Sequence, residues 1–179
     1  MRVIAGRYKG RRLQAPTWEG LRPTSDKLRE TLFNILAPRI AGARVLDGFA
    51  GTGAVGIEAL SRGAAHVTFV DEHRRAAALI AANLAACGVA ADYTIERSEA
   101  AAALRRAAGA GFDLILLDPP YDFTGLSDVL DAAAPALAPD GLLVLERASR
   151  REPAVPASWD RIRDVKSGDS TLTFMTRQP

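Results

Sequence analysis

From about residue 43 onward, short apolar runs alternate with longer segments in which apolar residues recur every three or four positions. Such runs are typical of buried strands, and the longer segments are typical of amphipathic helices. The predicted strands lie near 43–47, 66–71, 92–96, 112–117 and 142–146, with helices at about 54–63, 73–87, 99–109 and 125–137. Repeated strand–helix units of this length predict a parallel sheet with helices on both faces.

After Pro156 the pattern changes, because "WDRIRDVKSG" and "STLTFMTR" read as two strands joined through "SGDS". The predicted sheet then has seven strands and ends in a hairpin whose last strand is antiparallel. That arrangement is typical of the Rossmann-like α/β fold of S-adenosylmethionine-dependent methyltransferases. A plain flavodoxin-like or dinucleotide-binding fold lacks this ending.

The first 40 residues form a different kind of segment. Residues 1–15 alternate apolar and basic positions around two glycines, which indicates a short hairpin or an extended arm. In "RPTSDKLRETLFNILAPR", Thr24 or Ser25 is placed to cap a helix with an apolar stripe, and Pro38 is predicted to stop it. We therefore expect residues 1–40 to be a basic arm and helix that extend a methyltransferase domain at 41–179.

Composition excludes several classes of protein. A chain of 179 residues with 48% hydrophobic and 25% charged residues is typical of one globular domain. Cys87 is the single cysteine, so the chain cannot contain an internal disulfide or a cysteine metal site. His66 and His73 do not lie in a metal-ligand pattern either. We expect a cytoplasmic, metal-free monomer without a membrane segment, since no apolar run reaches spanning length.

The net charge of +2 conceals an asymmetry between the two ends of the chain. Residues 1–44 hold ten Lys/Arg and three Asp/Glu, a balance of +7, and the remainder holds 13 and 18, a balance of −5. A basic segment on a mildly acidic body favours docking of a polyanion there. A solvated basic face is the alternative interpretation.

A glycine-rich turn joins the first predicted strand of the alternating region to its helix, in "VLDGFAGTGAVGIEAL". The G-x-G-x-x-G pattern suits any ligand with a nucleoside lying over the turn, so a nicotinamide or flavin dinucleotide is an alternative. A carboxylate at the strand end favours the ammonium group of S-adenosylmethionine over a pyrophosphate, and a carboxylate ending the next strand suits ribose hydroxyls. The candidate cofactor-binding residues are Asp47, Phe49, Gly51, Thr52, Gly53, Asp71, Ser98 and Asp118.

The motif "DPPY" follows the fourth strand of this region, at Asp118, Pro119, Pro120 and Tyr121. Two prolines fix two φ angles and remove two backbone donors, which leaves a carboxylate, carbonyl oxygens and an aromatic ring. This set suits an exocyclic amine: the Asp118 carboxylate and the Pro119 carbonyl accept its two N–H groups, and Tyr121 stacks on the extruded base. We expect these four residues to be the catalytic tip.

Structural interpretations stand beside these functional ones. Asp47 and Asp71 are each placed to cap the helix that follows, and Ser98 suits an N-cap. Tyr121 suits a core position after a strand-ending turn. Glu58 and Ser61, in the helix after the glycine turn, are adequately explained by packing.

Three segments together resemble the RsmD family of bacterial 16S ribosomal RNA guanine-N2 methyltransferases: "RPTSDKLRETLFN" at 22–34, "LDGFAGTGAVGIEALSRGA" at 46–64 and "DPPY" at 118–121. The likeness runs from the arm at 4–13 to the final hairpin. It implies an S-adenosylmethionine cofactor and a guanine amine held at the catalytic tip. It also implies 16S rRNA in the small ribosomal subunit, or an assembly intermediate, as partner.

The resemblance assigns RNA docking and closure of the active site to the arm and the segment from Arg22 to Asn34. The substrate-binding candidates are Arg7, Lys9, Arg11, Arg12, Arg22, Thr24, Arg29 and Tyr121. The chemistry of the tip also suits N6-adenine methylation of DNA or RNA, or methylation of a glutamine amide. A non-catalytic RNA-binding assembly factor and a dinucleotide-dependent oxidoreductase are further alternatives.

Overall fold

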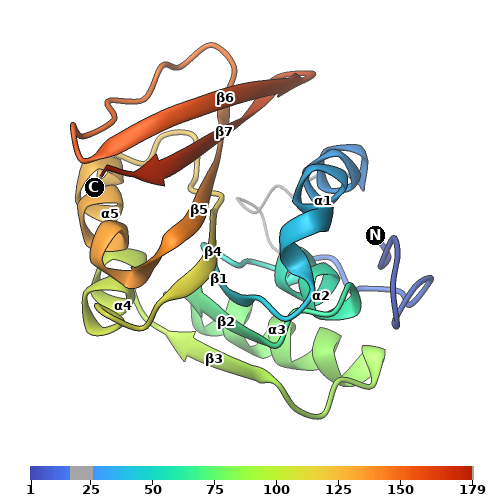
Figure 1. The fold of residues 1–179 in the computed structure, drawn as a ribbon. Coiled ribbons are helices and arrows are strands. Elements are labelled where there is room, and N and C mark those ends of the chain that lie inside the picture. Colours follow the sequence, from blue (N-terminus) through green and yellow to red (C-terminus); the bar gives the residue numbers. More distant parts are fainter. Residues whose placement is uncertain (17–25, 179) are drawn as a thin grey trace.

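The computed structural model describes residues 1–16 and 26–178 and is built on one seven-stranded sheet with the order β3-β2-β1-β4-β5-β7-β6 (Figure 1). Strands β1 to β5 pair in parallel, whereas β7 is antiparallel to both β5 and β6. The predicted fold class is therefore confirmed. The strands are β1 (Arg44–Gly48), β2 (His66–Asp71), β3 (Tyr93–Arg97), β4 (Phe112–Leu117), β5 (Leu137–Ala148), β6 (Trp159–Ser167) and β7 (Ser170–Arg177).

Helices cover both faces of the sheet, and each face has its own core (Figure 1). One face carries α1 (Asp26–Ile40), α2 (Ala54–Ser61) and α3 (Arg74–Cys87). The other carries α4 (Ala100–Arg106), α5 (Leu126–Ala133) and the 3-10 turn η1 (Ala134–Ala136). Because the central strands are buried on both sides, their sequences are continuous apolar runs rather than alternating ones.

Strands β1 and β4 lie side by side, but the chain leaves them toward opposite faces of the sheet, to α2 and to α5. This point is where strand order reverses, and ligands of open α/β sheets bind in the crevice that it creates. The two strands pack so closely there that a Cβ added at Gly48 would lie 2.7 Å from Leu117 Cδ2.

Helix α1 extends further than the sequence indicates, since Pro38 lies inside it and the helix ends at Ile40. The prediction that Pro38 stops this helix is wrong. Proline removes only one hydrogen bond in a last turn, and buried Leu36 and Ile40 hold that turn against the core. The predicted caps Thr24 and Ser25 lie outside the described residues.

Strand β5 is also longer than the predicted strand at 142–146, because it includes Pro139, Asp140 and Gly141, residue types that are typical of turns. The pairing with β4 shifts register between Phe112 and Leu114, which accommodates the irregular stretch. Tertiary pairing therefore overrides a local turn signal here.

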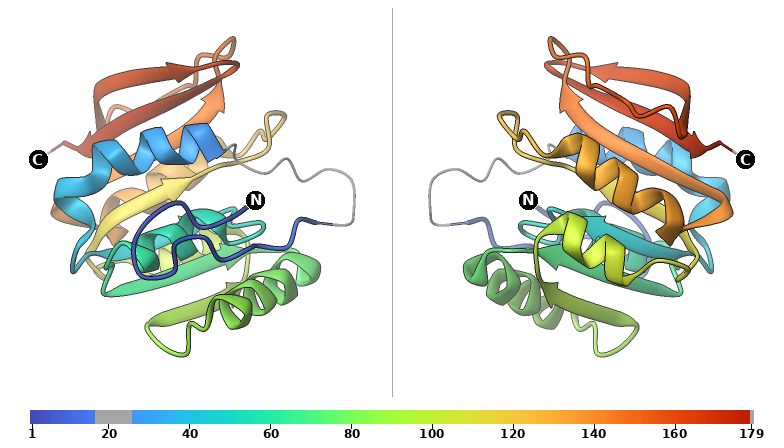
Figure 2. Two further views of the ribbon diagram at one scale, coloured as in Figure 1. Left: turned by 90° about the vertical axis from the view of Figure 1, so that its right-hand side faces the viewer. Right: turned by 90° about the vertical axis from the view of Figure 1, so that its left-hand side faces the viewer.

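The N-terminal arm folds back on itself, as predicted. Val3 donates its amide to Arg11 O at 3.0 Å, Gly10 donates to Val3 O at 2.9 Å, and Arg2 and Arg12 form a bridge. Val3 and Leu13 are buried, and the arm lies across α2 (Figure 2).

Candidate active site

A cleft of about 1090 Å³ opens at the carboxyl ends of the central strands. Its walls come from five loops, at 47–54, 71–73, 98–101, 118–125 and 167–170. The size exceeds what one small ligand fills, so the cleft has room for a nucleoside cofactor and part of a second substrate. Of the predicted cofactor and catalytic residues, all but Gly53 line it.

The glycine turn adopts left-handed backbone at three positions, with φ of 61° at Phe49, 54° at Gly51 and 75° at Gly53. Glycine takes this conformation without strain, whereas Phe49 is an exception that the surrounding loop must hold in place. Gly53 is the N-cap of α2 and packs on Ile80, so its role is to shape the turn from behind the cleft.

The third glycine of the pattern serves packing. A Cβ at Gly56 would lie 2.2 Å from Phe69 Cε1, so only glycine lets α2 approach β2 this closely. The helix therefore brings its N-terminus directly behind the cleft.

Asp47 is buried at the end of β1, where its Oδ2 accepts a hydrogen bond of 2.8 Å from the Gly56 amide. Burial raises the pKa of this carboxyl to about 7, against the opposing effect of the Gly56 bond, and the charge of Asp71 raises it further. The interpretation of Asp47 as a helix cap therefore holds in part, because its carboxylate accepts a hydrogen bond from an amide in the first turn of α2. The raised pKa also means that the ionised carboxylate is unfavourable in the free protein, so a cation bound in the cleft would stabilise it.

Asp71 ends β2 and holds two loops together. Its Oδ2 accepts from the Gly51 amide at 2.9 Å, and its Oδ1 accepts from the His73 amide at 2.9 Å. It does not cap α3, whose N-cap is His73. Glu72, which sequence reasoning missed, is exposed and lines the same part of the cleft, and the paired acids of "VTFVDEH" were its signal.

Ser98 lines the cleft after β3 but does not cap the next helix, so that structural interpretation is wrong. The N-cap of α4 is Glu99, which lies beside it in the cleft wall. Ser98 Oγ instead donates to Glu99 O at 3.2 Å and accepts from Arg106 at 2.7 Å.

The DPPY segment turns sharply away from β4. The Asp118 amide donates to Gly48 O at 3.3 Å, and the Pro120 carbonyl accepts from the Phe123 amide at 2.9 Å. Tyr121 is 38% exposed in the cleft, so the alternative of a core tyrosine is wrong. Its partly exposed ring and Asp118 line the same cleft.

Polar contacts fix Tyr121 to the final hairpin. Its hydroxyl lies 3.0 Å from Ser170 Oγ, which in turn donates to Glu146 Oε1 at 3.1 Å. Phe123, 37% exposed, packs edge to face on Phe49 with centroids 5.1 Å apart. Sequence reasoning missed Glu146 and Ser170, because no motif links residues from strands so far apart in the chain; it also missed Phe123, which follows the DPPY motif closely.

The predicted substrate-binding residues divide into three groups. Arg7, Lys9, Arg11 and Arg12 are exposed on the arm. Arg29 is fully buried, so it presents no surface to a substrate and its predicted role does not hold in this structure. Its guanidinium pairs with Asp26 at 3.0 Å and lies 3.9 Å from the Glu58 carboxylate. Arg22 and Thr24 lie outside the described residues.

Nothing in residues 1–16 and 26–178 forms a cluster of three His, Cys, Asp or Glu side chains suited to a metal ion. Within the same ranges, no helix combines the length and apolar character needed to cross a bilayer.

The strand order, the glycine turn and the DPPY tip at the switch point together define the class, a Rossmann-like methyltransferase. The family described as Conserved hypothetical protein 95 matches residues 1–176. Ribosomal RNA small subunit methyltransferase D of Escherichia coli is 36% identical over 181 residues, which cover 99% of this chain and 90% of that one. The chain belongs to this family, the RsmD family.

Solved structures agree with this assignment. The yhhF protein of Escherichia coli superposes with a TM-score of 0.84 at 36% identity, over 99% of this chain and 98% of that one. SMU.776, a methyltransferase complexed with SAH, superposes with a TM-score of 0.66 over 82% of this chain and 48% of that one. At 16% identity, this second likeness shows the fold alone.

Proposed function

We propose that this protein uses S-adenosylmethionine to methylate the exocyclic N2 amine of a guanine in 16S rRNA, on the small ribosomal subunit or a late assembly intermediate. The observation that carries the proposal is the exposed Tyr121 in the same cleft as Asp118 and the glycine turn. The relatives named for small-subunit rRNA methylation supply the substrate class. The resemblance of the three sequence segments to the RsmD family implies guanine 966 as the position.

The residues of the cleft fit the proposed cofactor. The Asp47 carboxylate, with its raised pKa, suits the ammonium group, and Asp71 and Glu72 offer acceptors for ribose hydroxyls. The backbone at Gly51 leaves room for close approach, because it has no Cβ. When bound, S-adenosylmethionine supplies the electrophilic methyl group.

The chain's own contribution is to position and polarise the amine. An aromatic amine is a poor nucleophile, because its lone pair is delocalised into the ring. Acceptance of its two N–H groups by the Asp118 carboxylate and the Pro119 carbonyl draws the nitrogen toward tetrahedral geometry, and stacking on Tyr121 holds the base. Transfer is then a direct displacement, in which positioning and electrostatics provide most of the acceleration.

The decisive experiment is methyl transfer from labelled S-adenosylmethionine to small ribosomal subunits that lack the modification, followed by nucleoside analysis. N2-methylguanosine in the digest is the expected product. N6-methyladenosine would keep the mechanism and overturn the base assignment. Absence of transfer to these subunits, with transfer to DNA or protein instead, would overturn the substrate.

A further inference from the structure

Four of the buried polar side chains away from the cleft lie under the N-terminal arm, and the chemistry at the DPPY tip does not use them. Arg29, Glu58 and Asn83 are 0% exposed, and Ser61 is 4% exposed. Burial of such groups is unfavourable unless each finds partners. All four bond to the main chain of the N-terminal arm, residues 1–14.

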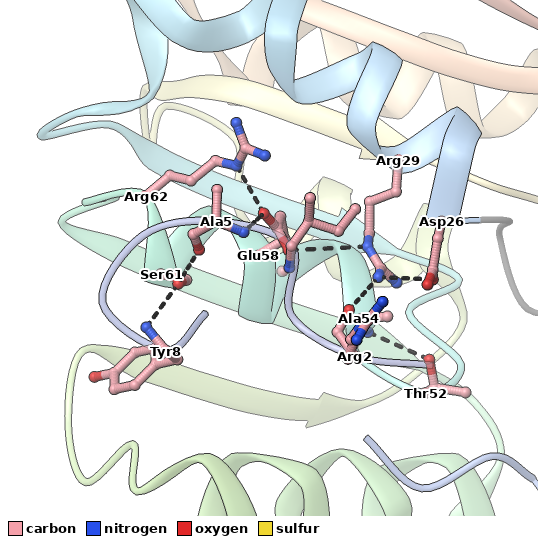
Figure 3. A network of polar contacts seen from close by, with 12 residues as sticks. Arg2, Ala5, Tyr8, Asp26, Arg29, Thr52, Ala54, Glu58, Ser61 and Arg62 are labelled. Carbon is pink, nitrogen blue, oxygen red and sulfur yellow. Dashed lines mark hydrogen bonds and ion pairs between the residues drawn. The ribbon is translucent and has the colours of Figure 1, made fainter. Parts of the chain in front are cut away.

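Glu58, on the buried face of α2, holds the start of the arm (Figure 3). Its Oε2 accepts from the Ile4 amide at 2.8 Å, and its Oε1 accepts from the Ala5 amide at 3.0 Å. Arg62 donates to the same Oε1 at 2.7 Å. A carboxylate between two backbone amides and two guanidinium groups is strongly satisfied, so Glu58 is a firm anchor.

Ser61, one turn further along α2, fixes the next part of the arm (Figure 3). Its Oγ accepts from the Tyr8 amide at 2.9 Å and donates to the Ala5 carbonyl, and its own carbonyl accepts from the Arg7 amide at 2.7 Å. Gly6 lies so close that a Cβ there would be 1.9 Å from Ser61 O. The arm is therefore held flush against the helix by its main chain.

Asn83, on α3, holds the other end of the arm. Its Oδ1 accepts from the Gln14 amide at 2.7 Å, and its Nδ2 donates to Thr52 O at 2.9 Å. Thr52 belongs to the glycine turn and lines the cleft. The arm therefore runs from α2 to the rim of the active site.

The basic side chains of the arm are exposed to solvent, where another partner can reach them. Residues 1–14 contain five basic residues and no acidic one. Arg2, Arg7, Lys9, Arg11 and Arg12 are all exposed, and across the described ranges none of them forms an ion pair with a carboxylate. A main chain fixed by α2 and α3 thus displays five exposed cations, and its Gln14 end lies next to the glycine turn.

We propose that Glu58 and Ser61 are positioning residues for RNA: they hold the arm as a pre-formed strap whose cations contact the phosphate backbone beside the target base. This inference rests on the proposed function. A pre-ordered strap avoids the entropy loss of ordering the arm on binding, and it keeps the cations in register with the cleft.

The test uses Glu58→Gln in the full-length protein, because the amide keeps the shape but cannot accept all the bonds of the carboxylate. We expect affinity for the small subunit to fall about tenfold, while affinity for S-adenosylhomocysteine stays within about twofold. Ser61→Ala removes fewer contacts and should give a smaller loss in the same direction. Asp131→Asn is the control, since Asp131 is an exposed acid of α5, on the face of the sheet opposite the arm.

A double-mutant cycle separates positioning from general destabilisation. In a protein with Arg7, Lys9, Arg11 and Arg12 replaced by glutamine, Glu58→Gln should cause no further loss of RNA affinity, because the strap no longer carries its cations. The inference would be overturned if Glu58→Gln lowered RNA affinity equally in the wild-type and arm-variant backgrounds, or if it did not lower RNA affinity in the wild-type background. Either result would count even if the wild type binds and methylates RNA. A wild-type protein that neither binds nor methylates small subunits would instead overturn the proposed function and this inference together.

Discussion

Two buried carboxylates in this protein have opposite surroundings, and the difference indicates what each one does. Glu58 receives two amide hydrogen bonds and faces the guanidinium groups of Arg29 and Arg62. Asp47 receives one amide bond and lies at the wall of the cleft, with the acidic Asp71 nearby. Glu58 is therefore satisfied within the fold, whereas the charge of Asp47 is stabilised only when a cation arrives.

The pH dependence of cofactor binding follows from Asp47. Its pKa of about 7 in the free protein means that the carboxyl is largely neutral at pH 6 and ionised at pH 8. Since the ammonium group binds the ionised form, affinity for S-adenosylhomocysteine should rise about tenfold between pH 6 and pH 8. Isothermal titration calorimetry across this range measures the effect.

The matched variant is Asp47→Asn, in which binding should be weaker and nearly independent of pH over the same range. The ligand-free variant should also be more stable at pH 8, by roughly 1–3 kcal/mol. The folded-state pKa lies above the unfolded value of 3.8, so the wild type loses stability as pH rises toward and through 7. A pH profile of the variant that parallels the wild type would assign the titration to another group.

Asp118 should be needed for transfer, and its loss should leave cofactor binding nearly intact. Asp118→Ala removes one acceptor of the amine, and we expect kcat to fall by roughly 100-fold or more, by analogy with loss of one oxyanion-hole donor. Single-turnover transfer and calorimetric binding of S-adenosylhomocysteine measure the two properties separately. Equal loss of both would show that the catalytic tip lies elsewhere.

At the scale of the element, α2 combines three tasks in eight residues. Its N-terminus receives the glycine turn, Gly56 packs on β2, and Glu58 and Ser61 anchor the arm. The sequence pattern identified the glycines as part of a cofactor-binding turn, but it predicted only a packing role for Glu58 and Ser61. Both side chains bond to backbone amides of the arm. Every residue except proline has such an amide, so no sequence pattern identifies these partners.

Gly56→Ala tests the packing of this helix. Helix propensity alone predicts that alanine would stabilise by about 1 kcal/mol. The overlap with Phe69 should reverse the sign and destabilise the protein by roughly 1–3 kcal/mol, because neither α2 nor β2 can move aside freely. Urea denaturation decides between the two signs.

At the scale of the whole molecule, charge and topology act together. The basic arm of residues 1–14 folds back over α2, and its Gln14 end bonds to Asn83 next to the glycine turn, so this end of the arm lies close to the cleft. The acidic groups that we identify sit inside the cleft, at Asp47, Asp71 and Asp118. This separation suits a polyanion that docks outside while a cationic cofactor and a neutral base bind within.

The salt dependence of RNA binding tests the arm. Replacement of Arg7, Lys9, Arg11 and Arg12 by glutamine should weaken binding and lower the slope of log K against log salt by up to about 3, at roughly 0.7–0.9 for each phosphate contact. Arg39→Gln, near the start of β1 at the opposite end of the strands, is the control and should leave the slope unchanged. An unchanged slope in the arm variant would exclude the arm from the interface.

The sequence alone determined the features that depend on local chemistry. Strand and helix periods, the glycine turn and the DPPY tip each follow from residues close together in the chain, because backbone conformation and side-chain period are local properties. Topology rules then placed the glycine turn and the tip in one crevice. These predictions agree with the structure in the seven-stranded sheet with its antiparallel last strand and in the lining of the cleft.

Only the tertiary structure decided which polar residues face inward and what they bind. Arg29 was predicted to contact RNA, but its side chain is buried. Pro38 was predicted to end its helix, but it lies within that helix. Glu58 accepts hydrogen bonds from amides 54 and 53 residues away in the sequence, and the Tyr121 hydroxyl bonds to a serine 49 residues away. Such contacts are set by how elements pack, and packing depends on all the elements at once rather than on any segment of the sequence.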